Sequence, residues 1–226
     1  MCGRYALYAD LPVIARFVQA PEPTFDWQPR YNVAPTQSVP VCRVDAHQDR
    51  QLARLRWGLV PHWATDLAIG FKAINARSEG IASKPMFRSA FKSRRCLVPT
   101  NGFYEWEKIG KAKQPYFIHP AAVDLMAFAG LWETWDKGEE TVETFTIITT
   151  EANDATRQLH ERMPVILSPD TFAAWFDPAS TQAELLDLLR PAPHGALAIF
   201  PVDARVGNVK NDDARLIEPR SDPFSA

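Results

Sequence analysis

The sequence predicts an α+β fold with a mostly antiparallel β core, either barrel-like or built from two packed sheets, and peripheral helices. Segments that alternate in hydrophobicity, or are rich in β-branched and aromatic residues, outnumber segments with helical periodicity. The 19 prolines and 10 glycines are spread through the chain and indicate many short elements joined by turns. With 226 residues, 46% of them hydrophobic, a single domain over residues 1–226 can bury a sufficient core.

Individual segments justify this fold. Seven are predicted to be strands: 39–44, 52–59, 116–119, 125–133, 145–150, 165–167 and 196–202. Four are predicted to be helices: 12–19, 151–161, 169–176 and 182–189. The first helix has a proline early in its first turn, and each of the other three follows a Ser or Thr that can cap it. From about residue 212 to 226 the chain is rich in Pro, Asp and Ser, which predicts a loose tail.

Charge is unevenly distributed along the chain. The net charge of −2 argues against a general nucleic-acid coat protein. The stretch from Lys72 to Cys96, however, holds seven basic residues against the single acid Glu79. Such a stretch is typical of a phosphate-binding groove or of a solvated basic surface, and charge alone does not decide between them.

Cysteine usage and hydropathy indicate a cytosolic protein. We find no secretory signal and no apolar stretch long enough to span a membrane. The three cysteines are odd in number and widely spaced, which supports neither a disulfide framework nor a zinc site. We therefore expect reduced thiols, no metal and no cofactor.

The opening Met1-Cys2 is the most informative pair of residues. Cells normally remove an initiator methionine that precedes a small residue, which would leave Cys2 with both a free α-amine and a thiol. Such an aminothiol condenses with an aldehyde to a Schiff base, and the thiolate then closes a thiazolidine ring. With ordinary pKa values of about 8 and 8.5, both groups are partly reactive at neutral pH. The alternative is that Met1 stays on, or that Cys2 simply starts a strand.

Three further segments place polar residues among apolar ones. Asn75 and Arg77 alternate with small or apolar neighbours, as on a strand or its edge, and could face one cleft. Glu105 lies among three aromatic residues, which would desolvate its carboxylate and make it an acid or base, unless its side chain points outward into water. His160 lies at the end of the expected helix 151–161, where it could act in catalysis or merely cap the helix electrostatically.

Two more segments have both a binding and a structural interpretation. The glycine and asparagines of residues 206–211 let the backbone approach a ligand or merely bend, and a structural turn is the simpler interpretation. Trp57 and Trp63 flank a glycine and a proline, and one of them could offer an exposed surface for stacking a base, although most tryptophans are buried.

Seven short motifs together resemble those of a known family. They are Cys2-Gly3-Arg4-Tyr5, Tyr31-Asn32-Val33-Ala34-Pro35, Trp57-Gly58-Leu59-Val60-Pro61, Ile74-Asn75-Ala76-Arg77, Gly102-Phe103-Tyr104-Glu105-Trp106, His160-Glu161-Arg162-Met163-Pro164 and Val206-Gly207-Asn208-Val209-Lys210-Asn211. Each motif is weak alone, but their joint order, with a cysteine at position 2, is highly specific. The chain resembles the SRAP family, the SOS-response-associated peptidase-like proteins that crosslink to abasic sites in DNA.

The resemblance implies a single SRAP-type domain that senses DNA damage. Cys2 would form a covalent thiazolidine with an abasic site in single-stranded DNA and so shield the lesion for repair. Asn75, Glu105 and His160 would complete the active site: Glu105 by moving protons, Asn75 by holding the amine or sugar, and His160 by assisting ring opening. The activity would be lyase-like, with a possible autopeptidase step that exposes Cys2.

The expected partner is single-stranded DNA containing abasic sites, at replication forks. We expect three arginines to bind phosphates: Arg4, Arg77 and Arg162. Asn32, Pro35 and Thr149 are expected to line the path of the strand, and Trp63 to stack on or wedge against a flanking base. We expect a cytoplasmic monomer that does not bind membranes and that associates with the nucleoid by binding DNA.

Two other functions stay open on the sequence. One is an N-terminal-nucleophile cysteine peptidase or amidase, in which the Cys2 thiolate attacks an amide and its own amine serves as the base. The other is a noncovalent nucleic-acid-binding module. The mass of the product formed with abasic DNA separates the three.

Overall fold

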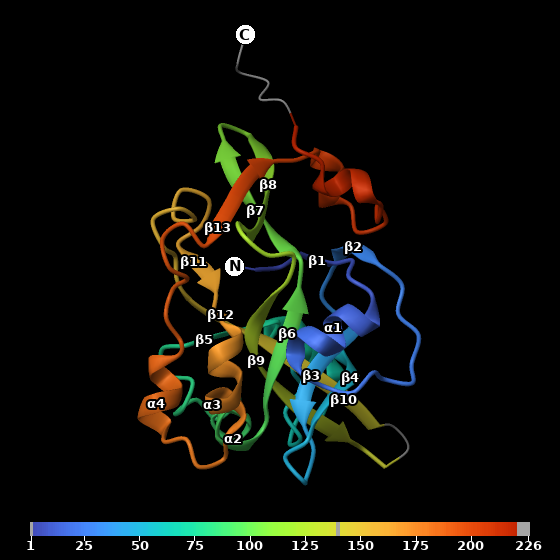
Figure 1. The fold of residues 1–226 in the computed structure, drawn as a ribbon, viewed down its shortest axis with the longest axis vertical. Helices are drawn as coiled ribbons and strands as arrows, with labels where there is room; N and C mark the ends of the chain where they lie inside the picture. Colours follow the sequence, from blue (N-terminus) through green and yellow to red (C-terminus); the bar gives the residue numbers. More distant parts are fainter. Residues whose placement is uncertain (1, 139–140, 221–226) are drawn as a thin grey trace.

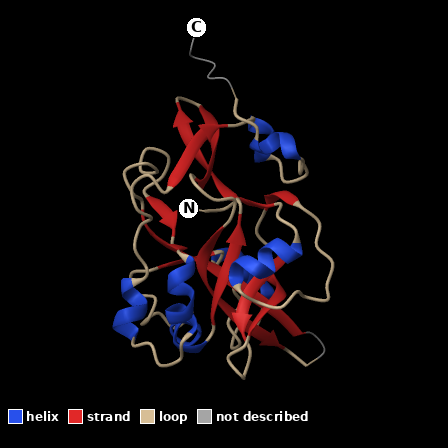
Figure 2. Cartoon of the chain, in the orientation of Figure 1, coloured by secondary structure: helices blue, strands red, loops and turns tan. Residues whose placement is uncertain are grey.

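The computed structural model describes residues 2–138 and 141–220 and arranges them as an α+β domain (Figure 1, Figure 2). Most strands pair in antiparallel fashion, and the helices are short and lie outside the sheets. The predicted fold class is therefore confirmed. None of the helices formed by the described residues is long and apolar enough to cross a membrane.

Five strands close into a barrel. In order around it they are β3 (Ser38–Val44), β4 (Arg50–Trp57), β10 (Thr141–Glu151), β9 (Met126–Asp136) and β6 (Arg95–Thr100), which returns to β3. Only the β10–β4 pair of this ring is parallel. The ring is filled by large apolar side chains, among them Trp57, Phe128 and Phe145. Because the ring is closed, none of its five strands is an open edge. Of the two predicted forms of the β core, this part of the molecule is therefore the barrel-like one.

Short strands extend the ring at the ends of β9 and β10. β5 (Asn75–Arg77) runs parallel to β10, β11 (Arg162–Pro164) pairs with its far end, and β12 (Ile166–Leu167) pairs with β9. A separate five-stranded sheet has the order β13 (Leu197–Pro201), β8 (Ala112–Pro120), β7 (Gly102–Ile109), β1 (Tyr5–Leu7) and β2 (Arg30–Val33).

Local chemistry explains the helices. α1 (Leu11–Val18) has Pro12 in its first turn, buries Ile14 and Val18, and ends at Gln19 in the left-handed conformation. α2 (Arg88–Ser93) and α3 (Phe172–Phe176) are short. α4 (Gln182–Asp187) begins with a capping box, in which Thr181 accepts from the Glu184 backbone while the Glu184 carboxylate accepts from that of Thr181. The 3₁₀ turns are η1 (Leu67–Lys72), η2 (Pro169–Thr171), η3 (Ala204–Gly207) and η4 (Ala214–Ile217).

All seven predicted strands are present with shifted ends, and three of the four helices are found, the one at 169–176 as η2 followed by α3. The helix predicted over 151–161 is wrong: Glu151 ends β10, and the chain then turns. The side chain of Asn153 accepts hydrogen bonds from both the backbone N–H and the hydroxyl of Thr156, and so stabilises a turn in place of a helix.

The C-terminal region is more ordered than predicted. Within the segment expected to be a loose tail, residues 212–220 pack against the domain. Asp212 binds Arg30 and the backbone of Tyr31, and Leu216 of η4 is fully buried. The rest of that segment, 221–226, lies outside the described residues.

Candidate active site around Cys2

Strand pairing brings the start of the chain beside Glu105. β1 lies between β2 and β7, with Tyr5 opposite Phe103, and the backbone N–H of Tyr104 donates to the carbonyl of Arg4 (3.0 Å). Cys2 is fully buried in the same core as Phe103. Because residues two apart on a strand share a face, Glu105 points to the same side of β7 as Phe103.

Asn75 reaches the same point from the larger sheet. Its Nδ2 donates to the carbonyl oxygen of Cys2 at 2.8 Å. Its Oδ1 is buried, and no hydrogen-bond partner for it is found among the described residues. A buried, unused acceptor beside the reactive residue can serve a ligand that carries a donor.

A close backbone contact fixes the loop that leads to Asn75. Gly58 has φ +121°, and a Cβ added there would lie 2.7 Å from the carbonyl oxygen of Gly70. Only glycine accepts both that conformation and that approach. The contact between Gly58 and Gly70 closes the loop that follows β4. This loop carries Trp63 and leads into β5.

Glu105 and Cys2 influence each other electrostatically. Burial raises the pKa of the Glu105 carboxyl above its usual range, and positive charge at the amino terminus partly opposes this. Burial also raises the pKa of the Cys2 thiol strongly, and the nearby Glu105 carboxylate adds to the effect. The outward-facing alternative for Glu105 is excluded, since only 5% of the residue is exposed. A buried carboxyl of raised pKa beside a thiol is suited to proton transfer.

His160 lies in the turn before β11, not at a helix end, so the proposed helix-capping role does not apply. Its Nδ1 accepts a hydrogen bond from the backbone N–H of Arg162 at 2.9 Å, which leaves Nε2 as the protonated nitrogen of the neutral ring. Burial, helped by positive charge at the amino terminus, lowers the pKa of His160. Positive charge at the amino terminus thus acts on both Glu105 and His160, so both side chains lie within electrostatic range of the start of the chain.

Arg162 is already held by the protein. Its Nη1 and Nη2 donate to the two carboxylate oxygens of Glu79 (2.6 and 2.8 Å), and Nη2 also donates to the carbonyl of Thr149 (2.7 Å). In the sequence Glu79 stood out only as the one acid of a basic stretch, and this pairing was missed. Its place two residues after Arg77 was the available signal.

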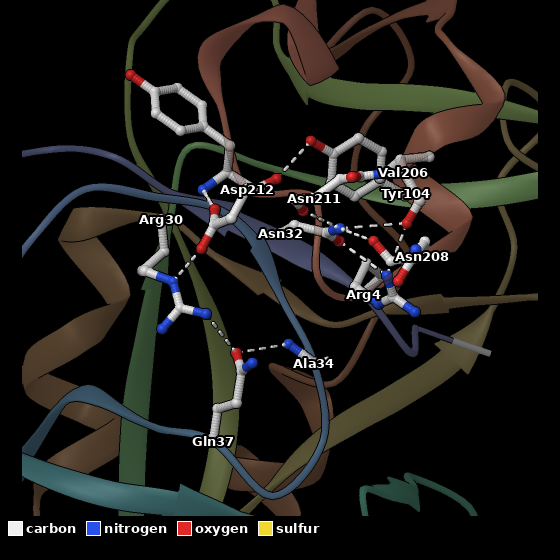
Figure 3. A network of polar contacts seen from close by, with 11 residues as sticks. Arg4, Arg30, Asn32, Ala34, Gln37, Tyr104, Val206, Asn208, Asn211 and Asp212 are labelled. Atoms are coloured by element: carbon white, nitrogen blue, oxygen red, sulfur yellow. Dashed lines mark hydrogen bonds and ion pairs between the residues drawn. The ribbon is translucent and has the colours of Figure 1, made fainter.

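Arg4 belongs to a second network, shown in Figure 3. Its Nη1 donates to the Oδ1 of Asn32 (2.8 Å) and to the carbonyl of Val206 (2.7 Å), and its guanidinium lies 6.0 Å from the ring centre of Trp106. The Nδ2 of Asn32 donates to three backbone carbonyls, those of Val206, Asn208 and Asn211. Segment 206–211 is therefore a structural turn held against Arg4.

The remaining residues predicted to contact DNA differ in how far they are exposed to solvent. Arg77 is exposed on β5, opposite Thr149 in register, and Thr149 is itself buried. Pro35 is half-buried in the turn after β2, and Trp63 is 51% exposed on the loop after β4. Asn32 is fully buried with both ends of its amide engaged, so it can act on DNA only by orienting Arg4.

The other two cysteines lie on paired strands of the barrel wall. Cys42 and Cys96 are buried on β3 and β6, and burial raises the pKa of both thiols, that of Cys42 to about 12. Buried thiols of high pKa are poor nucleophiles. Across the described ranges, no three His, Cys, Asp or Glu side chains gather as metal ligands would.

The family model described as "SOS response associated peptidase (SRAP)" matches residues 1–209. The chain belongs to the SRAP family. Among curated SRAP relatives, "Abasic site processing protein YoqW" of Bacillus subtilis (strain 168) is 40% identical over 223 residues, covering 96% of this chain and 99% of the relative. "Abasic site processing protein HMCES" of Gallus gallus is 35% identical, covering 85% of this chain and 67% of the relative.

Solved structures agree with the SRAP assignment at the level of the fold. A crystal structure of a protein from Bacteroides thetaiotaomicron superposes with a TM-score of 0.86 at 27% identity and covers 97% of this chain and 100% of that one. A further curated relative, matched by sequence, is "Abasic site processing protein YedK" of Escherichia coli (strain K12), which is 32% identical and covers 97% of this chain and 100% of the relative.

Proposed function

We propose that this SRAP protein captures abasic sites in single-stranded DNA as a covalent thiazolidine on Cys2, once Met1 has been removed. The observation that carries the proposal is the hydrogen bond from the Asn75 amide to the Cys2 carbonyl; the electrostatic effect of Glu105 on the Cys2 thiol, and that of the amino terminus on His160, support it. The names of its relatives, which process abasic sites, supply the substrate class.

The reaction balances with the loss of one water. The α-amine of Cys2 adds to the aldehyde C1′ of the ring-opened sugar, and the resulting carbinolamine loses water to give an imine. The thiol then gives up its proton, sulfur bonds to C1′, and the imine nitrogen takes a proton to become the ring amine. One C–N bond and one C–S bond form, and no oxidant or reductant is needed.

The chain's own residues suit these steps. A buried Glu105 of raised pKa can donate a proton as water leaves and can accept one from the thiol. The high pKa of the buried Cys2 thiol keeps it protonated until such a base acts on it. The neutral His160 presents its Nε2–H as a donor for the sugar oxygen, and the unused Oδ1 of Asn75 can accept from the amine.

Binding in this proposal depends on backbone contacts, because an abasic nucleotide has no base to read. Arg4, Arg77 and Arg162 each clamp one phosphate. Single-stranded DNA exposes the sugar without a cost for unpairing, so the expected site of action is a single strand such as that at a replication fork. We expect a monomer in the cytoplasm, associated with the nucleoid through its DNA.

Intact-mass spectrometry after mixing with abasic single-stranded DNA tests the proposal. The expected product has the summed masses of Met1-free protein and oligonucleotide less one water. Cys2→Ser keeps an amine but cannot close the ring, so it should give only a labile imine and some strand cleavage by β-elimination. A stable adduct on protein that retains Met1 would overturn the proposal, and an acyl-enzyme formed with a peptide would assign an N-terminal-nucleophile hydrolase.

A further inference from the structure

A hollow of about 840 Å³ lies beside the Trp63 loop, apart from the four residues around Cys2. Three segments form it: the loop after β4 with His62 and Trp63, the stretch from Ala82 through α2, and residues 178–185, which end in α4. Its size is within the range of small-ligand sites. We call it the flank hollow.

The flank hollow carries uncommitted positive charge. Arg88 and Lys92 are four residues apart on α2, so they project from one face of that helix into the same space. Both are exposed, and neither side chain forms a hydrogen bond or ion pair with any described residue. The lining contains no Asp or Glu. An anion bound here therefore meets two cations and no opposing carboxylate among the lining residues.

The neighbouring arginines serve the fold instead. Arg94 is paired with the buried Glu133, and Arg95 is buried with its guanidinium donating to backbone carbonyls of Phe91, Lys92, Trp175 and Asp177. The basic stretch that the sequence left undecided is thus divided. One part holds the structure together, and the other is free to bind phosphate.

The remaining lining suits an aromatic base. Trp63, half of which is exposed, lines the hollow, and Phe91 and Leu185 add apolar lining. Ser180 and Gln182 supply neutral hydrogen-bonding groups. An exposed indole beside two cations is the combination with which proteins bind single strands without regard to sequence.

The flank hollow lies within reach of the strand at Cys2. Ala82, which lines it, is five residues from Arg77, and five extended residues span at most about 18 Å. At about 3.4 Å per nucleotide, the rise along each strand of a stacked duplex, this corresponds to at most roughly five nucleotides, and to fewer in an extended single strand.

We propose that the flank hollow binds the sugar-phosphate backbone and one base of the single strand a few nucleotides away from the lesion, with Arg88 and Lys92 on phosphates and Trp63 stacked on the base. This inference rests on the proposed capture of abasic DNA. It adds two phosphate contacts to the three assigned to Arg4, Arg77 and Arg162.

The test is the salt dependence of noncovalent binding, measured by fluorescence anisotropy. The probes are a 15-nucleotide and a 5-nucleotide single strand, each with a central tetrahydrofuran in place of the abasic sugar, which has no aldehyde to capture. Five contacts at roughly 0.7 each predict a slope of about −3.5 in log K against log salt for wild type on the long strand. The double variant R88A/K92A should give about −2.

Expressed as affinity, wild type should lose roughly 130-fold between 50 and 200 mM salt on the long strand, and the double variant roughly 20-fold. On the short strand the two slopes should coincide near −2. The matched control is K108A/K113A, which removes two exposed lysines from the β7–β8 hairpin, at the opposite end of the molecule from α2 and α4 (Figure 1). It should keep the wild-type slope.

Trp63→Leu tests stacking separately from charge. It should weaken binding of the long strand at least fivefold without changing the slope. Equal slopes for wild type and R88A/K92A on the long strand would overturn the inference. So would dependence on Arg88 and Lys92 that appears with adenosine monophosphate but not with the 15-mer, since that would assign the hollow to free nucleotides.

The two proposals fail in different ways. If wild type forms no adduct with a true abasic 15-mer, capture is wrong, whatever the salt slopes show. If wild type forms the adduct but R88A/K92A binds the 15-mer as wild type does, only the flank hollow is wrongly assigned.

Discussion

The backbone N–H of Arg162 donates to Nδ1 of His160, and this one bond sets the protonation state of the candidate catalytic ring. An imidazole whose Nδ1 accepts a hydrogen bond must carry its proton on Nε2 when neutral. Arg162 is fixed in turn by Glu79 and by the carbonyl of Thr149. His160 is therefore oriented from β10 through the backbone of a neighbouring strand.

His160 should be a neutral Nε2–H donor at pH 7. Burial and positive charge at the amino terminus lower its pKa, so the ring should gain a proton only at a more acidic pH than an ordinary histidine does. Ring ¹⁵N NMR shifts, followed as a function of pH, report both the tautomer and the pKa. The resonance of the same residue in urea-unfolded protein is the reference.

This shift also has a consequence for stability. A histidine whose pKa is lower in the folded state contributes its stability above the unfolded pKa, and that stability is lost as pH falls through the folded value. His160→Gln should therefore lose less stability than wild type on acidification below the ordinary histidine range. An Nδ1-protonated ring, or a folded pKa above the urea value, would contradict this account.

Glu105→Gln should slow crosslinking by about 10²- to 10⁴-fold, the usual contribution of a general acid or base. The amide is nearly isosteric and keeps a hydrogen-bonding side chain, but it cannot exchange protons. Affinity for a tetrahydrofuran strand should stay nearly unchanged. Single-turnover gel assays give the rate and anisotropy the affinity, and a large loss of affinity at an unchanged rate would instead assign Glu105 to binding or folding.

The same substitution should stabilise the fold at neutral and alkaline pH. The folded pKa of Glu105 is raised, so wild type loses stability as pH rises from the unfolded value through the folded one. Glu105→Gln removes that loss. Urea titrations should show a gain in unfolding free energy for the variant at pH 8 relative to wild type, and the gain should shrink toward pH 4; a pH-independent difference would argue against a titrating carboxyl.

The chemistry of the site was easier to predict from the sequence than its hydrogen-bonding network. The resemblance to the SRAP family singles out positions 2, 75, 105 and 160, and the residues there offer an amine with a thiol, an amide, an acid and an imidazole. The pairing of Arg162 with Glu79 depends on β5 and β11 flanking the same strand, β10, and a single sequence carries no record of such long-range pairing.

The same limit applies to the fold. Strands with alternating or β-branched patterns were found, whereas β6 was missed because all six of its residues are buried and it includes an arginine and a proline. Burial on both faces removes the alternation that identifies a strand. The false helix at 151–161 was predicted from a possible cap at Thr150, but the side chain of Asn153 stabilises a turn there instead.

Glu79→Gln should tighten binding of single-stranded DNA. In wild type the Glu79 side chain is 60% exposed, and its carboxylate accepts hydrogen bonds from both terminal nitrogens of Arg162. These bonds lower the pKa of Glu79, so that it stays ionised. The neutral amide frees that charge for a phosphate. We expect roughly two- to fivefold tighter binding at low salt, with the difference fading as salt rises.

Glu22→Gln is the matched control for Glu79→Gln, because it makes the same charge change on an exposed residue after α1. Anisotropy titrations at 20 and 200 mM salt compare the two. Weaker binding by Glu79→Gln would show that the carboxylate mainly holds Arg162 in its productive position.

Asn32→Ala should destabilise the domain by about 2–4 kcal/mol, because it removes the amide donor from one buried and two half-buried backbone carbonyls. The substitution also removes the acceptor that orients Arg4, so DNA affinity should fall even where the protein remains folded. Asn208→Ala is the control: that exposed side chain makes one local bond, to the Lys210 backbone, and should cost about 0.5 kcal/mol or less. Urea denaturation measures both, and equal small effects would mean that the 206–211 turn holds Arg4 without help from Asn32.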